Sequence, residues 1–183
     1  MTTAPGKLRN DSNALADYLE GESIPRSSAI LLTGRVDGRL VWALQRKRYL
    51  DITYAMDRGI PTKSRAGVDP IYVLLEGLSD QNNPACNFFK RFDIWHDGGE
   101  FQFLDTWQKQ SDYLRRVKNY LLIGGLFAIL SSKGNSCSGA FSDPAEIHGR
   151  LGLRFEMRAI IGSSIGAYSI PNRNETLSIF QYW

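Results

Sequence analysis

The stretch FFKRFDIWHDGGEFQFLDTWQKQSDYLRRVKNYLLIGGLFAILS, residues Phe88–Ser131, contains three hydrophobic periodicities in succession. Apolar and polar side chains alternate over Phe88–His96, which is typical of a β-strand. Asp97-Gly98-Gly99 has the composition of a turn, and Glu100–Leu104 alternates again. The first part of the stretch therefore predicts two antiparallel strands joined by a turn.

An amphipathic helix is predicted immediately afterwards, over Asp105–Asn119. Trp107, Leu114 and Val117 fall on one face of this helix, which predicts that they belong to the core. Asp105 stands where its carboxylate can accept hydrogen bonds from the first-turn amides, so we expect the helix to begin there.

Two further strands are predicted in the second half of the chain. Tyr120–Leu130 is an apolar run with Gly124-Gly125 in its middle. Because glycine costs about 1 kcal/mol in a helix interior, we expect a break followed by a buried strand, Leu126–Ser131. The strict alternation over Arg150–Ile161 indicates a half-buried antiparallel strand, which Ile165–Tyr168 is expected to return beside.

The first half predicts a short helix and a hairpin. The helix is expected over Asn13–Leu19, ended by Gly21. Ala29–Val36 and Arg39–Gln45 have the pattern of strands, and Asp37-Gly38 between them is a dipeptide that favours a tight hairpin turn.

These elements together predict an α+β fold. We expect an antiparallel sheet of five to seven strands, with one main amphipathic helix packed on it and a short N-terminal helix. Residues 1–27 are expected to form an N-terminal arm with that short helix, and residues 28–183 a single domain.

Composition is that of a globular protein of one domain. The 183 residues are 43% hydrophobic and 22% charged, with a formal net charge of +3. Two cysteines are too few for a disulfide framework, which favours a reducing, cytosolic compartment. The N-terminus has no secretory signal pattern, and the longest apolar run is about half of the roughly 20 residues that a membrane-spanning helix needs.

Motifs that would identify an enzyme are not found in the sequence. The segment Gly34–Gly38 lacks the Lys-Ser/Thr ending of a phosphate-binding loop. Gly162–Gly166 matches G-x-S-x-G in letters, but it follows an antiparallel strand rather than standing between strand and helix. His96 and His148 alone cannot make a metal site. We therefore expect no catalytic residue, no metal, no cofactor and no small-molecule substrate.

Basic residues are dispersed over several predicted elements and form the candidate binding surface for a nucleocapsid or anionic lipid. They are Arg46, Lys47, Arg48, Arg115, Arg116, Lys118, Arg150, Arg154 and Arg158. Exposed-looking apolar residues, including the apolar C-terminus, are candidates for self-association. They are Leu15, Tyr18, Leu19, Phe141, Phe180 and Trp183.

The order of elements resembles the core of rhabdovirus matrix proteins. The resemblance rests on Phe88–Trp95, Phe103–Trp107, the amphipathic helix, Leu122–Ser132 and the strand in Gly149–Ile161. It implies a non-enzymatic virion structural protein of a compact, plant-virus type. Such a protein would self-associate as a homo-oligomer, bind the viral nucleoprotein–RNA complex and contact an anionic membrane surface, in the virion and the host cytoplasm.

Two alternatives remain open. The same string of elements suits a bacteriophage tail-terminator or neck protein that assembles as a ring. The second alternative is a small regulatory binding module. We distinguish these hypotheses by the assembly state and by lipid binding.

Overall fold

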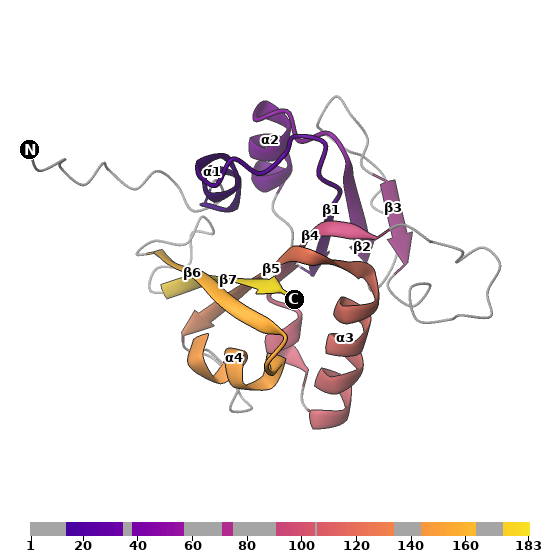
Figure 1. Ribbon diagram of the computed structural model, residues 1–183, viewed down its shortest axis with the longest axis vertical. Helices are drawn as coiled ribbons and strands as arrows, with labels where there is room; N and C mark the ends of the chain where they lie inside the picture. Colours follow the sequence, from indigo (N-terminus) through magenta and orange to yellow (C-terminus); the bar gives the residue numbers. More distant parts are fainter. Residues whose placement is uncertain are drawn as a thin grey trace, which may run out of the picture.

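The computed structural model describes residues 14–34, 38–56, 71–74, 91–104, 106–133, 144–163 and 174–183. In this part of the chain, seven strands form one sheet with helices on both of its faces (Figure 1). The strands are β1 (Ile30–Gly34), β2 (Ile52–Met56), β3 (Ile71–Leu74), β4 (Phe92–Gly98), β5 (Leu121–Lys133), β6 (Phe155–Ser163) and β7 (Asn174–Tyr182). The helices are α1 (Ala14–Gly21), α2 (Gly38–Arg46), α3 (Trp107–Tyr120) and α4 (Pro144–Leu151), with a short 3-10 turn, η4 (Phe101–Phe103).

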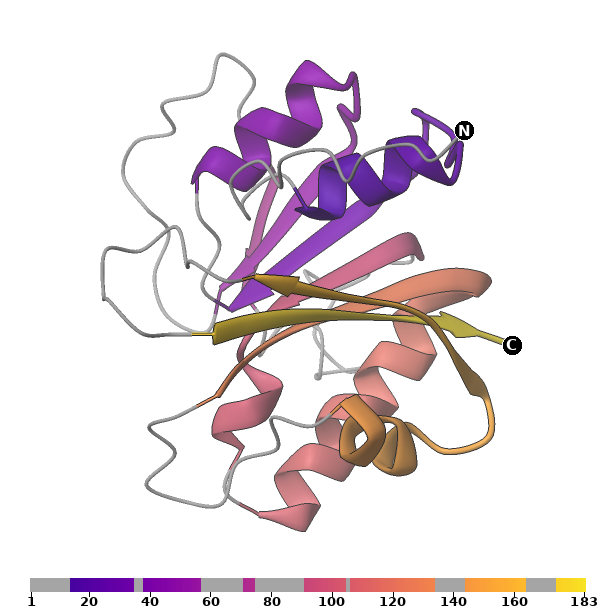
Figure 2. The same ribbon diagram turned by 90° about the vertical axis from the view of Figure 1, so that its left-hand side faces the viewer.

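The sheet is mostly parallel, so the expected antiparallel α+β fold is wrong. The strand order is β3-β2-β1-β4-β5-β7-β6, and the first five strands in this order pair in parallel. Only β7, between β5 and β6, runs antiparallel to its neighbours. Parallel neighbours need a crossover connection, and the helices α2 and α3 lie in two of these crossovers. The molecule is therefore an α/β protein with α1 and α2 on one face and α3 and α4 on the other (Figure 2).

The predicted hairpin at Asp37-Gly38 is a strand-to-helix connection instead. Residues Arg39–Gln45, predicted as a strand, lie in α2. Leu40, Val41, Ala43 and Leu44 are buried in α2, while Trp42 is 53% exposed. This spacing of one, three and four residues is helical. The strand prediction rested on the turn-forming dipeptide Asp37-Gly38 rather than on this spacing.

The predicted helix over Asp105–Asn119 is confirmed as α3, with differences at its start. Thr106 is the N-cap, and its side chain accepts a hydrogen bond from the Lys109 amide. Leu114 and Val117 are buried as predicted, but Trp107 is 58% exposed because it stands at the first helical position. Glu100–Leu104 is not a returning strand, since η4 occupies it and leads the chain into α3.

The stretch Phe88–Ser131 is therefore a β-α-β unit rather than a hairpin followed by a helix. Its first strand is found as β4, and residues 88–90 lie outside the described ranges. Its last strand begins earlier than predicted, at Leu121, and passes through the glycine pair. A Cβ on Gly125 would lie 2.8 Å from the carbonyl oxygens of Asp93 and Leu122, so the irregular pairing of β4 with β5 requires a glycine there.

In the C-terminal part, one predicted strand is confirmed, but it pairs with a different segment from the one predicted. The alternation in Arg150–Ile161 is found as β6, although its first residues belong to α4. The strand paired with β6 is β7, at the end of the chain, and the predicted partner Ile165–Tyr168 lies outside the described residues. The C-terminal segment is thus docked in the interior of the sheet, where Phe180 is fully buried.

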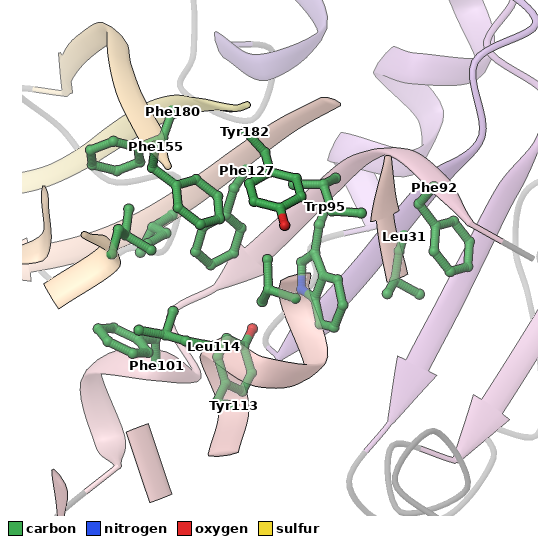
Figure 3. Close-up of a cluster of buried hydrophobic side chains, with 14 of the residues drawn as sticks. Leu31, Phe92, Trp95, Phe101, Tyr113, Leu114, Phe127, Phe155, Phe180 and Tyr182 are labelled. Atoms are coloured by element: carbon green, nitrogen blue, oxygen red, sulfur yellow. The ribbon is translucent and has the colours of Figure 1, made fainter. Parts of the chain in front are cut away.

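Two hydrophobic cores hold the layers together. The α2-side core includes Leu32, Leu44 and Ile94, together with Leu15 and Leu19 from α1. The α3-side core is rich in aromatic residues, drawn in Figure 3, and lies between the sheet and the helices α3 and α4. Its members include Trp95, Tyr113, Leu114, Phe127, Phe155, Phe180 and Tyr182.

Candidate functional site

The carboxyl ends of β1 and β4 form the candidate site. After β1 the chain continues to β2 and β3 on one side of β1, whereas β4 and β5 lie on its other side. The direction in which strands are added to the sheet therefore reverses between β1 and β4. In open parallel sheets, ligands bind in the crevice outside the strand ends at such a switch point. The last register pair of β1 and β4 is Gly34 with Gly98, which marks the edge where a ligand is expected.

Glycine is required where β1 ends. Gly34 has a φ of +72°, and a Cβ there would lie 3.3 Å from the Cβ and amide nitrogen of Glu100 and from the carbonyl carbon of Gly98. The end of β1 therefore packs closely against the backbone of the turn that follows β4. A Cβ added to Gly38, the first residue of α2, would meet nothing within 4 Å among the described residues. No described residue therefore crowds the Cβ position of Gly38, and helix N-termini favour negatively charged groups.

Asp97 fixes the turn after β4. Its carboxylate is buried and accepts hydrogen bonds from the amides of Glu100 and Phe101, the latter at 2.9 Å. Burial raises the pKa of Asp97 to about 6, and the backbone hydrogen bonds oppose this rise. With its oxygens engaged by the turn, Asp97 has a positioning role for the backbone at the edge of the site.

Thr33 connects the ends of β1 and β4 to α3. Its Oγ1 lies 3.1 Å from the Tyr113 hydroxyl, accepts a hydrogen bond from Trp95 Nε1 at 3.3 Å, and donates to the carbonyl of His96 at 3.3 Å. Trp95 and Tyr113 also meet edge to face, with centroids 5.9 Å apart (Figure 3). Burial, and then the charge of Asp97, raises the pKa of the Tyr113 hydroxyl well above its usual value, so it stays protonated.

His96 lies on the face of β4 that is covered by α2, opposite the face that carries Trp95. Side chains alternate along a strand, and Ile94, two residues earlier, is in the α2-side core. The imidazole is 5% exposed, and Nδ1 has no hydrogen-bond partner among the described residues. Burial lowers the pKa of His96 to about 4, so the ring is neutral at physiological pH. Within the same described ranges, no group of three or more His, Cys, Asp or Glu side chains could hold a metal ion.

The predicted basic surface residues lie on different sides of the molecule. Arg46, Lys47 and Arg48 are at the end of α2, and Arg115, Arg116 and Lys118 are on α3, across the sheet (Figure 2). Arg150 is on α4, Arg154 precedes β6 and Arg158 is in β6. The groups on α2 and α3 are therefore not brought together on one surface.

Several of these basic side chains have partners within the chain. Lys47 pairs with Asp17 at 2.9 Å and also with Glu20, which ties α2 to α1. Arg46 stacks on Trp42 with a distance of 4.6 Å from its guanidinium carbon to the ring centroid. Arg115 pairs with Asp112, Arg158 with Glu156, and Arg150 lies over Trp107.

The self-association candidates have three different placements. Leu15, Leu19 and Phe180 are buried in the chain's own core, and Tyr18 is half-buried. Trp183 is 55% exposed, and its indole nitrogen donates to Glu156. Phe141 lies outside the described residues.

The candidate site was not predicted from the sequence, although one signal for it was present. The signal is an apolar strand followed by Gly34-x-x-x-Gly38 and an amphipathic helix, which is the context of a ligand-binding glycine turn. An acidic residue, Asp57, follows β2 in the sequence about 20 residues later, where nucleotide-binding sheets carry one. Because Asp37-Gly38 was assigned to a hairpin, the segment after it was predicted as a strand and not as a helix. The strand, glycine and helix pattern of a ligand-binding turn was therefore not recognised.

Comparisons with known proteins support the fold. No family model and no curated protein matches the sequence. The 1,6-didemethyltoxoflavin-N1-methyltransferase of Burkholderia thailandensis, solved with its named ligand and S-adenosylhomocysteine, has a TM-score of 0.66 at 15% identity, over 94% of this chain and 79% of that one. The N-methyltransferase NodS of Bradyrhizobium japonicum, solved with S-adenosylhomocysteine, has a TM-score of 0.57 at 13% identity, over 94% and 89%. SpnF, a 4+2 cyclase, has a TM-score of 0.66 at 11% identity, over 93% and 80%.

These likenesses contradict the matrix-protein interpretation. The fold is that of S-adenosylmethionine-dependent methyltransferases, whereas the interpretation required an antiparallel sheet with one main helix. The ring-protein alternative used the same incorrect element string, and it is withdrawn together with the regulatory-module alternative. The expectations of a non-enzymatic protein that binds a nucleocapsid and takes no small-molecule substrate are contradicted too, because the similar structures are of enzymes, and two of them were solved with small molecules. Self-association and contact with an anionic membrane stay predictions. None of the described helices is both long and apolar enough to span a membrane.

Proposed function

We propose that this chain binds S-adenosylmethionine at the carboxyl ends of β1 and β4 and transfers its methyl group to a small-molecule acceptor. The observation that carries the proposal is the placement of two glycines, one at the end of β1 and one at the start of α2. Gly34 is packed against the turn after β4, and a Cβ on Gly38 at the start of α2 would meet no described atom within 4 Å, at the one switch point of the described sheet. The methyltransferase structures of the same fold support the choice of cofactor.

The residues at this edge fit the proposed cofactor. The first amides of α2 are donors that suit a carboxylate, such as that of the amino-acid part of the cofactor. Glu100 is half-buried beside Gly34 and offers a carboxylate for an ammonium or ribose hydroxyl group. When bound, S-adenosylmethionine supplies a methyl group on a sulfonium, which a nucleophilic acceptor takes as the carbon–sulfur bond breaks and S-adenosylhomocysteine remains.

The chain's own part in this chemistry is positioning. Asp97 holds the turn after β4 through two backbone amides, and Thr33 joins β1, β4 and α3 through its hydroxyl. Fixing the end of β1 and the turn after β4 would keep the ligand and the acceptor in one geometry, which is a large source of rate acceleration. Because SpnF has this fold with a different chemistry, cofactor binding and methyl transfer need separate tests.

Isothermal titration calorimetry with S-adenosylhomocysteine tests the proposed site. The wild-type chain is expected to bind, and Gly34→Ala is expected to lose most of the affinity, because the new Cβ meets the backbone of the turn after β4. Gly152→Ala is the matched control. Gly152 also has a positive φ, +78°, but it has open space and precedes β6 at the opposite edge of the sheet.

The control separates backbone strain from loss of the site. Both substitutions place alanine in the left-handed region, at a cost of about 1–2 kcal/mol each. Only Gly34→Ala should change ligand affinity. A folded wild-type chain that binds neither S-adenosylmethionine nor S-adenosylhomocysteine contradicts the proposed function. Methyl transfer is then measured as S-adenosylhomocysteine released with candidate acceptors.

A further inference from the structure

His96 is a buried polar side chain at the candidate site without an assigned partner. Its Nδ1 makes no hydrogen bond with the described residues, although the imidazole is only 5% exposed. Thr33, Asp97 and Tyr113 are buried close by in the sheet and α3, and each of them is hydrogen-bonded. Since buried polar groups are nearly always paired, Nδ1 requires a partner from beyond the described residues.

The position of His96 identifies where that partner lies. In the sheet, His96 is in register with Leu32 of β1 and Ala128 of β5, two residues before β4 ends at Gly98. Alternation places it on the face that α2 covers, whereas Trp95 belongs to the opposite core. It therefore lies just beneath the edge at which β1 turns into α2, which is where the proposed ligand binds.

The chemistry of His96 limits what it recognises. In the neutral state one ring nitrogen donates a hydrogen bond and the other accepts one, so the ring contacts ligands as a polar group without adding charge. Buried hydroxyls of Thr53 and Ser178 also have no partner among the described residues. However, Thr53 is near the start of β2 and Ser178 is in β7, away from the switch point.

We propose that His96 is a ligand-binding residue whose Nδ1 hydrogen-bonds to the S-adenosyl ligand in the crevice between the ends of β1 and β4. This inference rests on the proposed function for the identity of the ligand. It adds a specific contact from within β4 to those proposed for the end of β1 and the start of α2. A buried imidazole nitrogen without a partner among the described residues is suited to a ligand contact, and leaving it unpaired lowers the stability of the ligand-free protein.

Nitrogen NMR of the histidine side chains tests the contact directly. The chain has only two histidines, so two imidazoles are observed, and a His148→Gln variant assigns them. His148 is an internal control because its Nε2 is 2.8 Å from the Phe155 carbonyl and its ring stacks on Phe180. Saturating S-adenosylhomocysteine is expected to shift the Nδ1 resonance of His96 and to leave both nitrogens of His148 unchanged.

Two substitutions distinguish a ligand contact from a structural one. His96→Leu removes the polar atom at similar size and is expected to weaken S-adenosylhomocysteine binding by about tenfold, while the Tm of the free protein stays equal or rises. His96→Asn keeps a polar atom on Cγ, where Nδ1 is attached, and is expected to retain most of the affinity.

The outcomes separate this inference from the function on which it rests. An unmoved His96 resonance with bound ligand, or equal affinity in His96→Leu, overturns the contact and leaves the proposed function standing. A large fall in the Tm of free His96→Leu with equal affinity also overturns it, because Nδ1 then has a partner in the chain itself. If the wild-type chain binds no S-adenosylhomocysteine, the proposed function fails, and this contact fails with it.

Discussion

The hydroxyl of Tyr113, on α3, lies 3.1 Å from Oγ1 of Thr33, at the end of β1. The same threonine oxygen is also within 3.3 Å of Trp95 Nε1, on β4. One hydroxyl thus connects two strands that are distant in sequence with the helix that covers them. This connection holds the two strand ends that form the candidate site in a fixed relation to α3.

Removing the Tyr113 hydroxyl is expected to destabilise the protein. Tyr113→Phe leaves Thr33 and Asp97 with one fewer buried partner, at a cost of about 1–3 kcal/mol in the free energy of unfolding. Urea denaturation measures this change. Tyr182→Phe is the control, because Tyr182 is 7% exposed, packs on Phe155, and its hydroxyl makes no hydrogen bond with described residues. Equal losses in the two variants would show that the contact between the Tyr113 hydroxyl and Thr33 adds nothing to stability beyond the presence of a buried hydroxyl.

Asp97 and His96 are expected to give opposite pH dependences of stability. The pKa of Asp97 is raised from 3.8 to about 6 on folding, so the folded state binds more protons and stability falls as pH rises from about 4 to 6. The pKa of His96 is lowered from 6.5 to about 4, so the unfolded state binds more protons and stability rises over nearly the same interval. In the wild-type chain these two contributions largely cancel.

Variants separate the two contributions. Relative to wild type, Asp97→Asn should gain stability more steeply as pH rises from about 4 to 6.5, because only the His96 contribution remains. His96→Leu should instead lose stability over that range. Denaturation midpoints measured at about pH 4, 5, 6 and 7 give the slopes. If both variants keep the wild-type slope, neither group has its shifted pKa.

Gly125→Ala is expected to destabilise β5. Its Cβ would lie 2.8 Å from two carbonyl oxygens, of Asp93 and Leu122, so the irregular pairing with β4 must open. We expect a loss above about 2 kcal/mol, as for other overpacked sites. Gly149→Ala, in α4 with nothing within 4 Å, is the control and should stabilise by about 0.5–1 kcal/mol. A tolerated Gly125→Ala would contradict the pairing of β4 with β5 in this register.

Local patterns predicted individual elements better than their pairing. Two elements, α3 and β6, were predicted correctly from their hydrophobic periods. Each of these periods extends over many residues, which makes the pattern unambiguous. Pairing partners lie far apart in the chain, so nothing in the β1 sequence distinguishes a hairpin from a parallel neighbour. That choice depended on Arg39–Gln45 and on Glu100–Leu104, and placing both segments in strands gave the wrong fold class.

The candidate site was harder to predict than the fold. Asp97 stands in Asp-Gly-Gly, whose letters indicate a turn but not that the carboxylate is buried and caps the next amides. His96 was interpreted as structural because two histidines cannot form a metal site. Its significance depends on burial, on register with Leu32 and on an unpartnered Nδ1, which only three-dimensional placement provides.

The position of bound ligand is the most direct test of the central claim, that the edge formed by β1 and β4 binds an S-adenosyl compound. A crystal structure of the chain with S-adenosylhomocysteine is the measurement. We predict that the ligand lies against Gly34, the N-terminus of α2 at Gly38, and Glu100. Ligand bound at another place, or a crevice that stays empty while the protein binds no ligand in solution, would contradict this claim.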